Sequence, residues 1–228
     1  MVSKAVSVVL KVTTIVSAFT GILISALAGR RSFMGGNTVF MYFTVQSNIA
    51  VALIALIGLC FFCAAKKPGR AWDVIKFVGT VAITLTGVVF CAVLAPTLGD
   101  KAWNFQNILT HVVVPLAAIA DFFVMAKEYD IKKRSVFWVV VPPILYAIYA
   151  GIGYVQRWEF YPGSNYPYFF LNWGSPAGVF GFSDELPFMG TAWWILAILI
   201  FLIAIGLCYL FIADRIKKKA LSKANSRV

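Results

Sequence analysis

The chain has 228 residues, of which 61% are hydrophobic and 13% charged, and its formal net charge is +11. A soluble domain of this size cannot bury so much apolar surface, so the composition excludes a soluble globular protein. The positive charge would also suit a nucleic-acid-binding protein, but the basic residues gather at the ends of apolar runs. That distribution indicates a membrane as the partner and no nucleic acid.

Six apolar runs have about the length that a helix needs to cross a bilayer. Each is expected to be helical, because an open strand would leave backbone groups unpaired in lipid. The sequence therefore predicts an all-α fold, a six-transmembrane-helix bundle forming a single integral membrane domain over residues 1–228. The expected spans are residues 5–28, 39–63, 72–94, 105–126, 136–156 and 190–213.

The first run ends in Ala26-Leu27-Ala28, which resembles the cleavage site of a signal peptide. Its apolar stretch is long for a signal peptide, so a retained helix is favoured. Cleavage would remove one span and leave the downstream loop assignments unchanged.

The basic residues set the expected orientation. Of the 20 Lys and Arg residues, only Arg30, Arg31, Lys101 and Arg157 fall on one side of the six spans. The side with most positive charge faces the cytoplasm, so both termini are predicted to be cytoplasmic in a cell membrane. The basic C-terminal tail, with Lys217, Lys218 and Lys219, is expected to contact anionic lipid headgroups.

The second run places Thr44, Ser47 and Asn48 on one helix face, at spacings of three and four residues. Polar groups inside a membrane are costly unless they have partners, so each is a candidate for function. Hydrogen bonding between helices is the structural alternative for this cluster.

The fourth run contains His111, the only histidine of the chain, one turn after Asn107 and one turn before Pro115. Proline has no N–H, so the carbonyl of His111 loses its helical partner and a kink is expected. A structural histidine is the alternative to a catalytic one. A single histidine excludes bis-histidine haem ligation and argues against a histidine-built metal site, and no metal or cofactor is expected.

Depth connects the two clusters. Thr44 lies about 8 Å beyond the expected start of its helix and His111 about 9 Å beyond the start of its own, at 1.5 Å per residue. If the two helices are neighbours, the imidazole can act as general base toward the hydroxyl. Asn48, Asn107 and Ser47 are then candidates to orient the base or to bind substrate or a developing oxyanion.

Asp121 follows His111 by about 15 Å along the helix and cannot complete a triad with it. It is expected to pair with Lys11 or Lys76 near the cytoplasmic end, although proton or ion handling stays open. The four cysteines all fall in expected spans. The C-x-x-C of Cys60 and Cys63 has no second pair, which favours small apolar packing over a metal or redox site.

One connection is long, the outer loop of residues 157–189, and it is rich in aromatic residues, Gly and Pro. Aromatic residues favour the membrane interface, so the loop is expected to cover the outer mouth of the bundle as a cap. A simple interfacial belt is the alternative.

The segments FMYFTVQSN, NILTHVVVPLAAIADF and YPYFFLN resemble the androgen-induced and androgen-dependent regulator family of membrane proteins and its bacterial relatives. The resemblance covers roughly residues 38–125 and the YPY segment. It implies a multi-pass membrane threonine hydrolase of fatty acid esters of hydroxy fatty acids, of the bacterial type. Thr44 matches the family nucleophile and His111 the family histidine.

Together these features predict an intramembrane esterase of lipid metabolism, with membrane lipids and a lipid ester as its partners. Two other functions stay open. A small transporter or channel would use Asp121 and Asp73 to line a path, and a non-catalytic lipid-binding protein would bind lipid without turnover.

Overall fold

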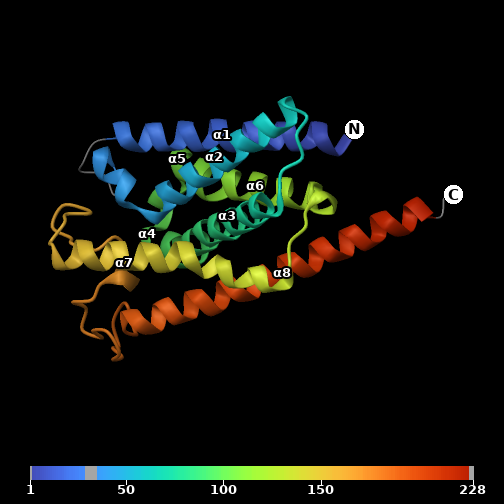
Figure 1. Cartoon of the computed structure of the whole chain (residues 1–228). Coiled ribbons are helices and arrows are strands. Elements are labelled where there is room, and N and C mark those ends of the chain that lie inside the picture. The colour runs from blue at the N-terminus through green and yellow to red at the C-terminus, as the bar shows by residue number, and fades with distance from the viewer. Residues whose placement is uncertain (1, 29–34, 226–228) are drawn as a thin grey trace.

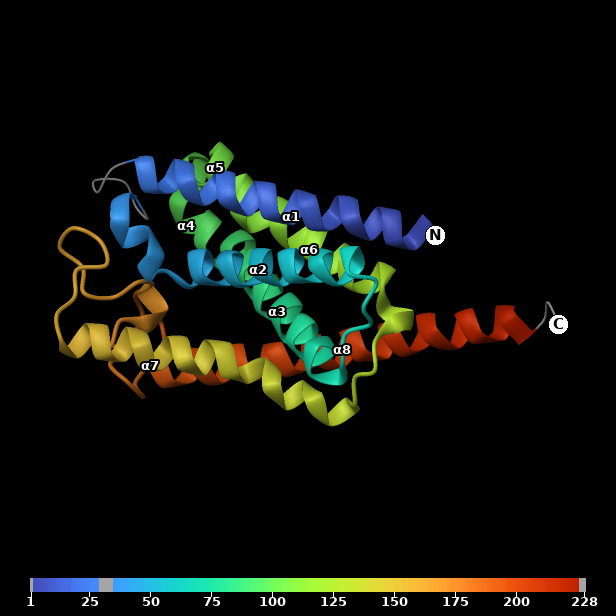
Figure 2. The same cartoon turned by 45° about the horizontal axis from the view of Figure 1, so that its top comes forward.

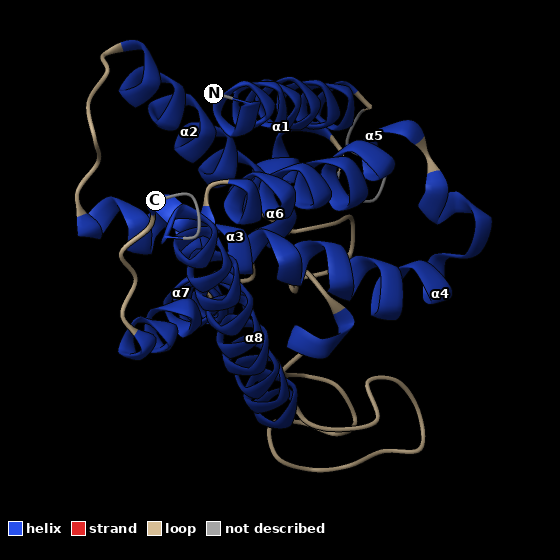
Figure 3. Ribbon diagram, turned by 90° about the vertical axis from the view of Figure 1, so that its right-hand side faces the viewer, coloured by secondary structure: helices blue, strands red, loops and turns tan. Residues whose placement is uncertain are grey.

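The computed structural model describes the backbone of residues 2–28 and 35–225 and the side chains of residues 3–28 and 35–222. Arg30 and Arg31, which the sequence assigns to the outer side, lie outside the described residues. Within these ranges the regular structure is helical, and β-structure is limited to two isolated bridges in the long loop (Figure 3).

Six helices, counted over the described residues, are long and apolar enough to cross a membrane, which confirms the expected number. Some are built from shorter pieces, and short 3₁₀ helices lie at Gly36–Met41, Ala126–Glu128 and Phe169–Leu171. Three spans are single helices: α1 (Val2–Leu27), α2 (Phe43–Cys63) and α8 (Thr191–Asn225). The third span joins α3 (Arg70–Val89), a π turn (Phe90–Leu94), α4 (Ala95–Leu98) and a 3₁₀ turn (Gly99–Trp103). The fourth joins α5 (Phe105–Ile108), a π turn (Leu109–Val113) and α6 (Val114–Val124), and the fifth joins a 3₁₀ segment (Lys133–Val140) and α7 (Val141–Val155).

Several boundaries differ from those expected: the third span runs on to Trp103 rather than ending at residue 94, and the fifth begins at Lys133 rather than at residue 136. Two further differences have reasons that hydropathy does not capture. The second span begins at Phe43 rather than at residue 39, because Tyr42 has an extended backbone that separates α2 from the preceding 3₁₀ helix. The last helix continues to Asn225, well beyond residue 213. Its extension is rich in Lys and Ala, which favour helix without needing a lipid environment.

The central helix of the bundle is α3, which packs against α2, α6, α8 and the segment Lys133–Val140. Of the most apolar 18 residues in the span that contains α3, 61% are buried, compared with 11% in α8. Most of α8 therefore faces outward. On one side of α3, α1 packs against both α2 and α6; on the other lie α7 and α8 (Figures 1 and 3).

The start of α1 and the end of α8 lie at the same end of the bundle (Figures 1 and 2). The long loop between α7 and α8 lies at the opposite end, together with the 3₁₀ helix before α2. Because the chain passes along the bundle an even number of times, six among the described residues, its first and last helices begin and end at the same end of the bundle. The start of α2 therefore belongs to the end of the bundle that carries the long loop.

Where a kink was expected before Pro115, the backbone forms the π turn Leu109–Val113. Pro115 cannot donate to the carbonyl of His111, and such a turn changes the register of the backbone hydrogen bonds. The carbonyl faces α3 at Gly87, where a Cβ atom would lie 3.0 Å from its oxygen. Glycine at this position lets the two helices approach closely enough to hold the turn in place.

Candidate active site

Thr44 and His111 meet inside the bundle. The hydroxyl oxygen of Thr44, in the first turn of α2, lies 3.3 Å from Nε2 of His111, in the π turn of the fourth span. Both side chains are buried, with relative exposures of 5% and 3%. The expected contact between the second and fourth spans is therefore present, whereas the catalytic roles of the two residues stay predictions.

The hydrogen bonds of the imidazole define its tautomer. Nδ1 of His111 lies 3.0 Å from the carbonyl oxygen of Asn107, which can only accept, so Nδ1 carries the proton. The hydroxyl of Thr110, 3.1 Å from Nδ1, donates to the carbonyl of Gln106 and can accept from the same N–H. Nε2 is left with a free lone pair facing the Thr44 hydroxyl, as a general base requires.

The plane of the imidazole is fixed by an aromatic neighbour. Phe90, from the π turn that follows α3, stacks on His111 with ring centroids 3.9 Å apart and planes inclined by 21°. Trp103 in turn packs edge-on against Phe90, with ring centroids 5.6 Å apart. The π turns of two spans thus position one face of the histidine and its hydrogen-bonding edge.

Tyr168, from the long loop, is the third polar group at this point. Its hydroxyl accepts a hydrogen bond from the backbone N–H of Thr44 at 3.4 Å and lies 3.5 Å from the Thr44 hydroxyl oxygen. Burial raises the pKa of Tyr168, so the phenol stays protonated. The sequence drew attention to the YPYFFLN segment but offered no reason to choose Tyr168 among its tyrosines.

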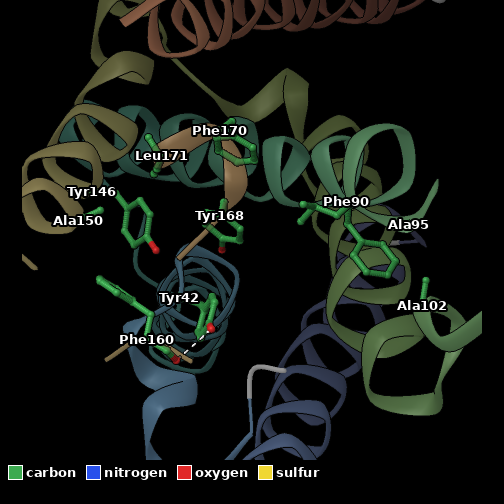
Figure 4. Close-up of a cluster of buried hydrophobic side chains, with 11 residues drawn as sticks. Tyr42, Phe90, Ala95, Ala102, Tyr146, Ala150, Phe160, Tyr168, Phe170 and Leu171 are labelled. Atoms are coloured by element: carbon green, nitrogen blue, oxygen red, sulfur yellow. Dashed lines mark hydrogen bonds between the residues drawn. The ribbon is translucent and has the colours of Figure 1, made fainter. Parts of the chain in front are cut away.

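An aromatic cluster holds this loop against the start of α2 (Figure 4). The hydroxyl of Tyr42 donates to the carbonyl of Phe160 at 3.1 Å, and that of Tyr146 donates to the carbonyl of Met41 at 3.1 Å. In Figure 4 the hydroxyls of Tyr146 and Tyr168 both point toward the ribbon of α2. Tyr168 is therefore placed by packing as well as by its own hydrogen bonds.

Asn48 does not fit the role of an oxyanion donor. Its side-chain amide donates to the carbonyls of Thr44, at 2.8 Å, and of Thr110, at 3.1 Å. Both N–H groups are used, and its oxygen, which lacks a hydrogen-bond partner among the described residues, can only accept. Asn48 instead ties the start of α2 to the turn that carries His111.

Asn107 contacts the histidine, as a residue that orients the base would, whereas the side chain of Ser47 contacts neither the Thr44 hydroxyl nor the imidazole. Asn107 orients the histidine through its backbone carbonyl, while its side chain donates to the carbonyl of Ala102 at 2.9 Å. The hydroxyl of Ser47 donates to the carbonyl of Thr44 at 3.0 Å and lies 2.7 Å from that of Thr86 on α3. Spacing along a helix places a side chain on a face but does not say which backbone groups it meets.

A cavity of about 60 Å³ adjoins the Thr44 and Tyr168 side chains. Its wall is almost entirely apolar, and it lies between α2, α3, α7, α8 and the long loop. It is lined by Phe43, Thr44, Leu85, Thr86, Val89, Phe90, Leu94, Pro143, Tyr146, Ala147, Tyr168, Phe170, Leu171, Ile195, Ile198 and Leu199. A hydroxyl next to an imidazole nitrogen therefore borders a space suited to an apolar group.

Asp121 lies apart from this site and has the expected partners. Its carboxylate pairs with both candidates, Lys11 at 2.7 Å and Lys76 at 2.7 Å, and accepts a hydrogen bond from Ser7 at 2.5 Å. The interpretation as a structural anchor is supported, since the carboxylate oxygens are all engaged.

Among the described residues, no group of three or more His, Cys, Asp and Glu side chains could hold a metal ion. Cys60, Cys63, Cys91 and Cys208 are free thiols with exposed side chains. The C-x-x-C pair thus lies at the surface of the bundle and not in its packed interior, which corrects the expectation of small residues packed within it.

The fold and the site define a helical protein with six membrane-compatible helices and a buried threonine–histidine pair beside an apolar cavity. No protein-family model, no curated protein and no solved structure matches the chain. The function is therefore inferred from the chemistry of the site.

Proposed function

We propose that this chain is an intramembrane hydrolase of lipid esters, with Thr44 as nucleophile and His111 as general base. One observation carries the proposal: Nε2 of the buried His111, whose Nδ1 lies 3.0 Å from the carbonyl oxygen of Asn107, lies 3.3 Å from the Thr44 hydroxyl oxygen. The resemblance to membrane threonine hydrolases of fatty acid esters of hydroxy fatty acids supports the same two residues.

The reaction proceeds in two halves. Nε2 of His111 takes the proton of the Thr44 hydroxyl as its oxygen attacks the ester carbonyl, and the imidazolium then protonates the departing alcohol. An acyl-threonine remains. A water molecule gives its proton to Nε2, attacks the acyl carbon and releases the carboxylic acid, while the proton returns to the Thr44 oxygen.

Tyr168 and the backbone of α2 provide the oxyanion donors in this scheme, in place of the asparagines. The phenol of Tyr168 lies beside the attacking oxygen and can donate to the oxyanion. The backbone N–H of Thr44, which donates to Tyr168 in the resting site, can turn to the oxyanion instead. The N–H belongs to the first turn of α2, where the helix dipole favours negative charge. Because Tyr168 stays protonated, it remains a donor at neutral pH.

The substrate class follows from the cavity. Its apolar wall suits a segment of acyl chain and offers no group to bind a sugar or a charged head. The cavity holds only part of a long chain. The remainder lies along exposed apolar side chains of α8 such as Leu196 and Ile200, which border the cavity residues Ile195 and Leu199.

The orientation is part of the proposal. The positive-inside rule places both termini in the cytoplasm, so the Thr44 site opens toward the outer leaflet of the cell membrane. The long loop of residues 157–189 then acts as an outer cap that delivers Tyr168 and separates the site from bulk water.

The test is covalent labelling with a fluorophosphonate probe, which reacts with activated hydroxyls. Thr44→Val and His111→Asn are expected to abolish labelling of the purified protein. Thr86→Val is the matched control, because Thr86 lines the same cavity and carries a hydroxyl without a base. Undiminished labelling of Thr44→Val would overturn the proposal.

The two other functions raised by the sequence have weaker support. A transport path through Asp121 would need an available carboxylate, whereas this one is held by two lysines and a serine. A non-catalytic lipid-binding protein would bind the probe neither at Thr44 nor elsewhere, so the same labelling experiment separates it from the hydrolase.

A further inference from the structure

A second cavity, of about 450 Å³, is lined by residues from the start of α1, the end of α2 and the start of α3. These segments lie at the end of the bundle opposite the long loop (Figure 2). The cavity volume is within the range of roughly 300–1,000 Å³ that small-molecule sites occupy. It takes no part in the chemistry of Thr44. Its wall contains two acidic residues, Asp73 and Glu128, and five lysines. The lysines are Lys4, Lys11, Lys66, Lys67 and Lys76.

Two of these lysines are buried, which is costly for a charge without compensation. Lys11 and Lys76 have relative exposures of 5% and 3% and share one carboxylate, that of Asp121. Two ammonium groups share this carboxylate, and even with Asp73 and Glu128 counted the five lysines leave the cavity with an excess of positive charge. Tyr129, which also lines the cavity, cannot supply the missing negative charge, because burial together with Asp121 and Asp73 raises its pKa.

The two ammonium groups differ in how well they are satisfied. Lys11 donates to Ser7 at 2.6 Å and to both oxygens of Asp121, at 2.7 and 2.9 Å. It reaches them past Gly58, where a Cβ atom would lie 2.7 Å from its Cε. Lys76 makes a single ion pair among the described residues, at 2.7 Å, although an ammonium has three N–H groups.

We propose that this cavity binds the phosphate group of an anionic phospholipid. The phosphate accepts from the unused N–H groups of Lys76 and supplies the negative charge that the cavity lacks. Lys66 and Lys67, both exposed at the entrance, attract it. The acyl chains leave along the apolar part of the wall, which includes Val8, Ile54 and Phe61.

The chemistry recognised is that of a phosphate oxyanion, which a lipid or a free anion could supply. The apolar wall favours the lipid, because inorganic phosphate would leave those side chains facing water. Lys76 lies about 9 Å along α3 from Arg70, at 1.5 Å per residue, a depth that suits a headgroup drawn slightly below the membrane surface.

The experiment is native mass spectrometry of the purified full-length protein with phosphatidylglycerol, phosphatidylcholine or inorganic phosphate as the probe. The intact protein is expected to retain phosphatidylglycerol in preference to phosphatidylcholine. Lys76→Met leaves Asp121 paired with Lys11 and should weaken that binding roughly ten- to hundredfold. Lys218→Met, an exposed lysine on α8 outside the cavity, is the matched control and should bind as the intact protein does.

Equal binding of phosphatidylglycerol by the intact protein and Lys76→Met would overturn the proposal, as would equal retention of phosphatidylcholine. Binding of inorganic phosphate with the same dependence on Lys76, without lipid retention, would contradict the lipid as occupant. Should Lys76→Met fail to fold, the double variant Lys66→Gln and Lys67→Gln changes only exposed side chains. Unchanged binding by that variant in low salt would then refute the site.

Discussion

Replacing Tyr168 with phenylalanine removes one oxygen atom from the proposed oxyanion site and leaves the ring in place. The ring stacks on Phe170 at a centroid distance of 5.1 Å and packs against Tyr42 at 5.8 Å, so the loop should keep its position. If the phenol donates to the oxyanion, its loss should slow reaction with a fluorophosphonate by a factor of about 10² to 10³. Because the Thr44 N–H remains as a second donor, the lower value is expected.

The same change should cost little stability. The buried N–H of Thr44 loses its acceptor, which costs about 1–3 kcal/mol, and the long distance of 3.4 Å favours the lower value. The assay measures the labelling rate constant and the thermal unfolding midpoint of Tyr168→Phe beside Tyr166→Phe, a control from the same loop. An unchanged labelling rate in folded Tyr168→Phe would refute the assignment of the phenol as a donor.

Two further predictions concern the helices around the site. Gly87→Ala places a methyl group 3.0 Å from the carbonyl oxygen of His111, so the turn that carries His111 must shift. The change should destabilise the protein by about 1–3 kcal/mol and slow its labelling by the fluorophosphonate. An unchanged unfolding midpoint and labelling rate would contradict this. Asp121→Asn leaves Lys11 and Lys76 without a counter-charge and should cost about 3–5 kcal/mol in thermal unfolding. Its folded fraction should still be labelled at Thr44, and a loss of labelling there would link Asp121 to the site.

The number of membrane-compatible helices was predictable because it follows from the lengths of the apolar runs. The ion pairs of Asp121 were also foreseeable, since a buried carboxylate needs a cation and few lysines lie at its depth. Boundaries were less certain: Tyr42 interrupts an apolar run by its backbone conformation, which hydropathy does not detect. Thr44 consequently lies nearer the helix start than its expected depth of about 8 Å.

The contact of Thr44 with His111 could be anticipated from depth and from the resemblance, but its chemical details could not. The tautomer of His111 depends on the backbone carbonyl of Asn107, and no residue pattern distinguishes that from a side-chain contact. Tyr168 lies in a loop without periodicity, so its approach to α2 depends on tertiary packing. Asn48 is of a residue type that can donate to an oxyanion, but its amide nitrogen is already engaged and only its oxygen, which cannot donate, is left without a partner among the described residues.

A polar network of this kind has a structural cost that favours a functional interpretation. The Thr44 hydroxyl, the imidazole and the phenol are all buried at the edge of an apolar cavity. Apolar side chains could fill this space without hydrogen-bonding requirements. The network is instead held by the Phe90 stack, the Asn48 bridge and the close approach at Gly87.

The central claim is that Thr44 carries the reactive oxygen, and locating the covalent adduct tests it most directly. After reaction of the intact protein with a fluorophosphonate, proteolysis and peptide mass spectrometry should find the phosphonyl group on Thr44. The adduct should be absent when His111 is replaced by asparagine. A phosphonyl group on Ser47, Thr86 or any other residue of the intact protein, with Thr44 unmodified, would contradict the claim.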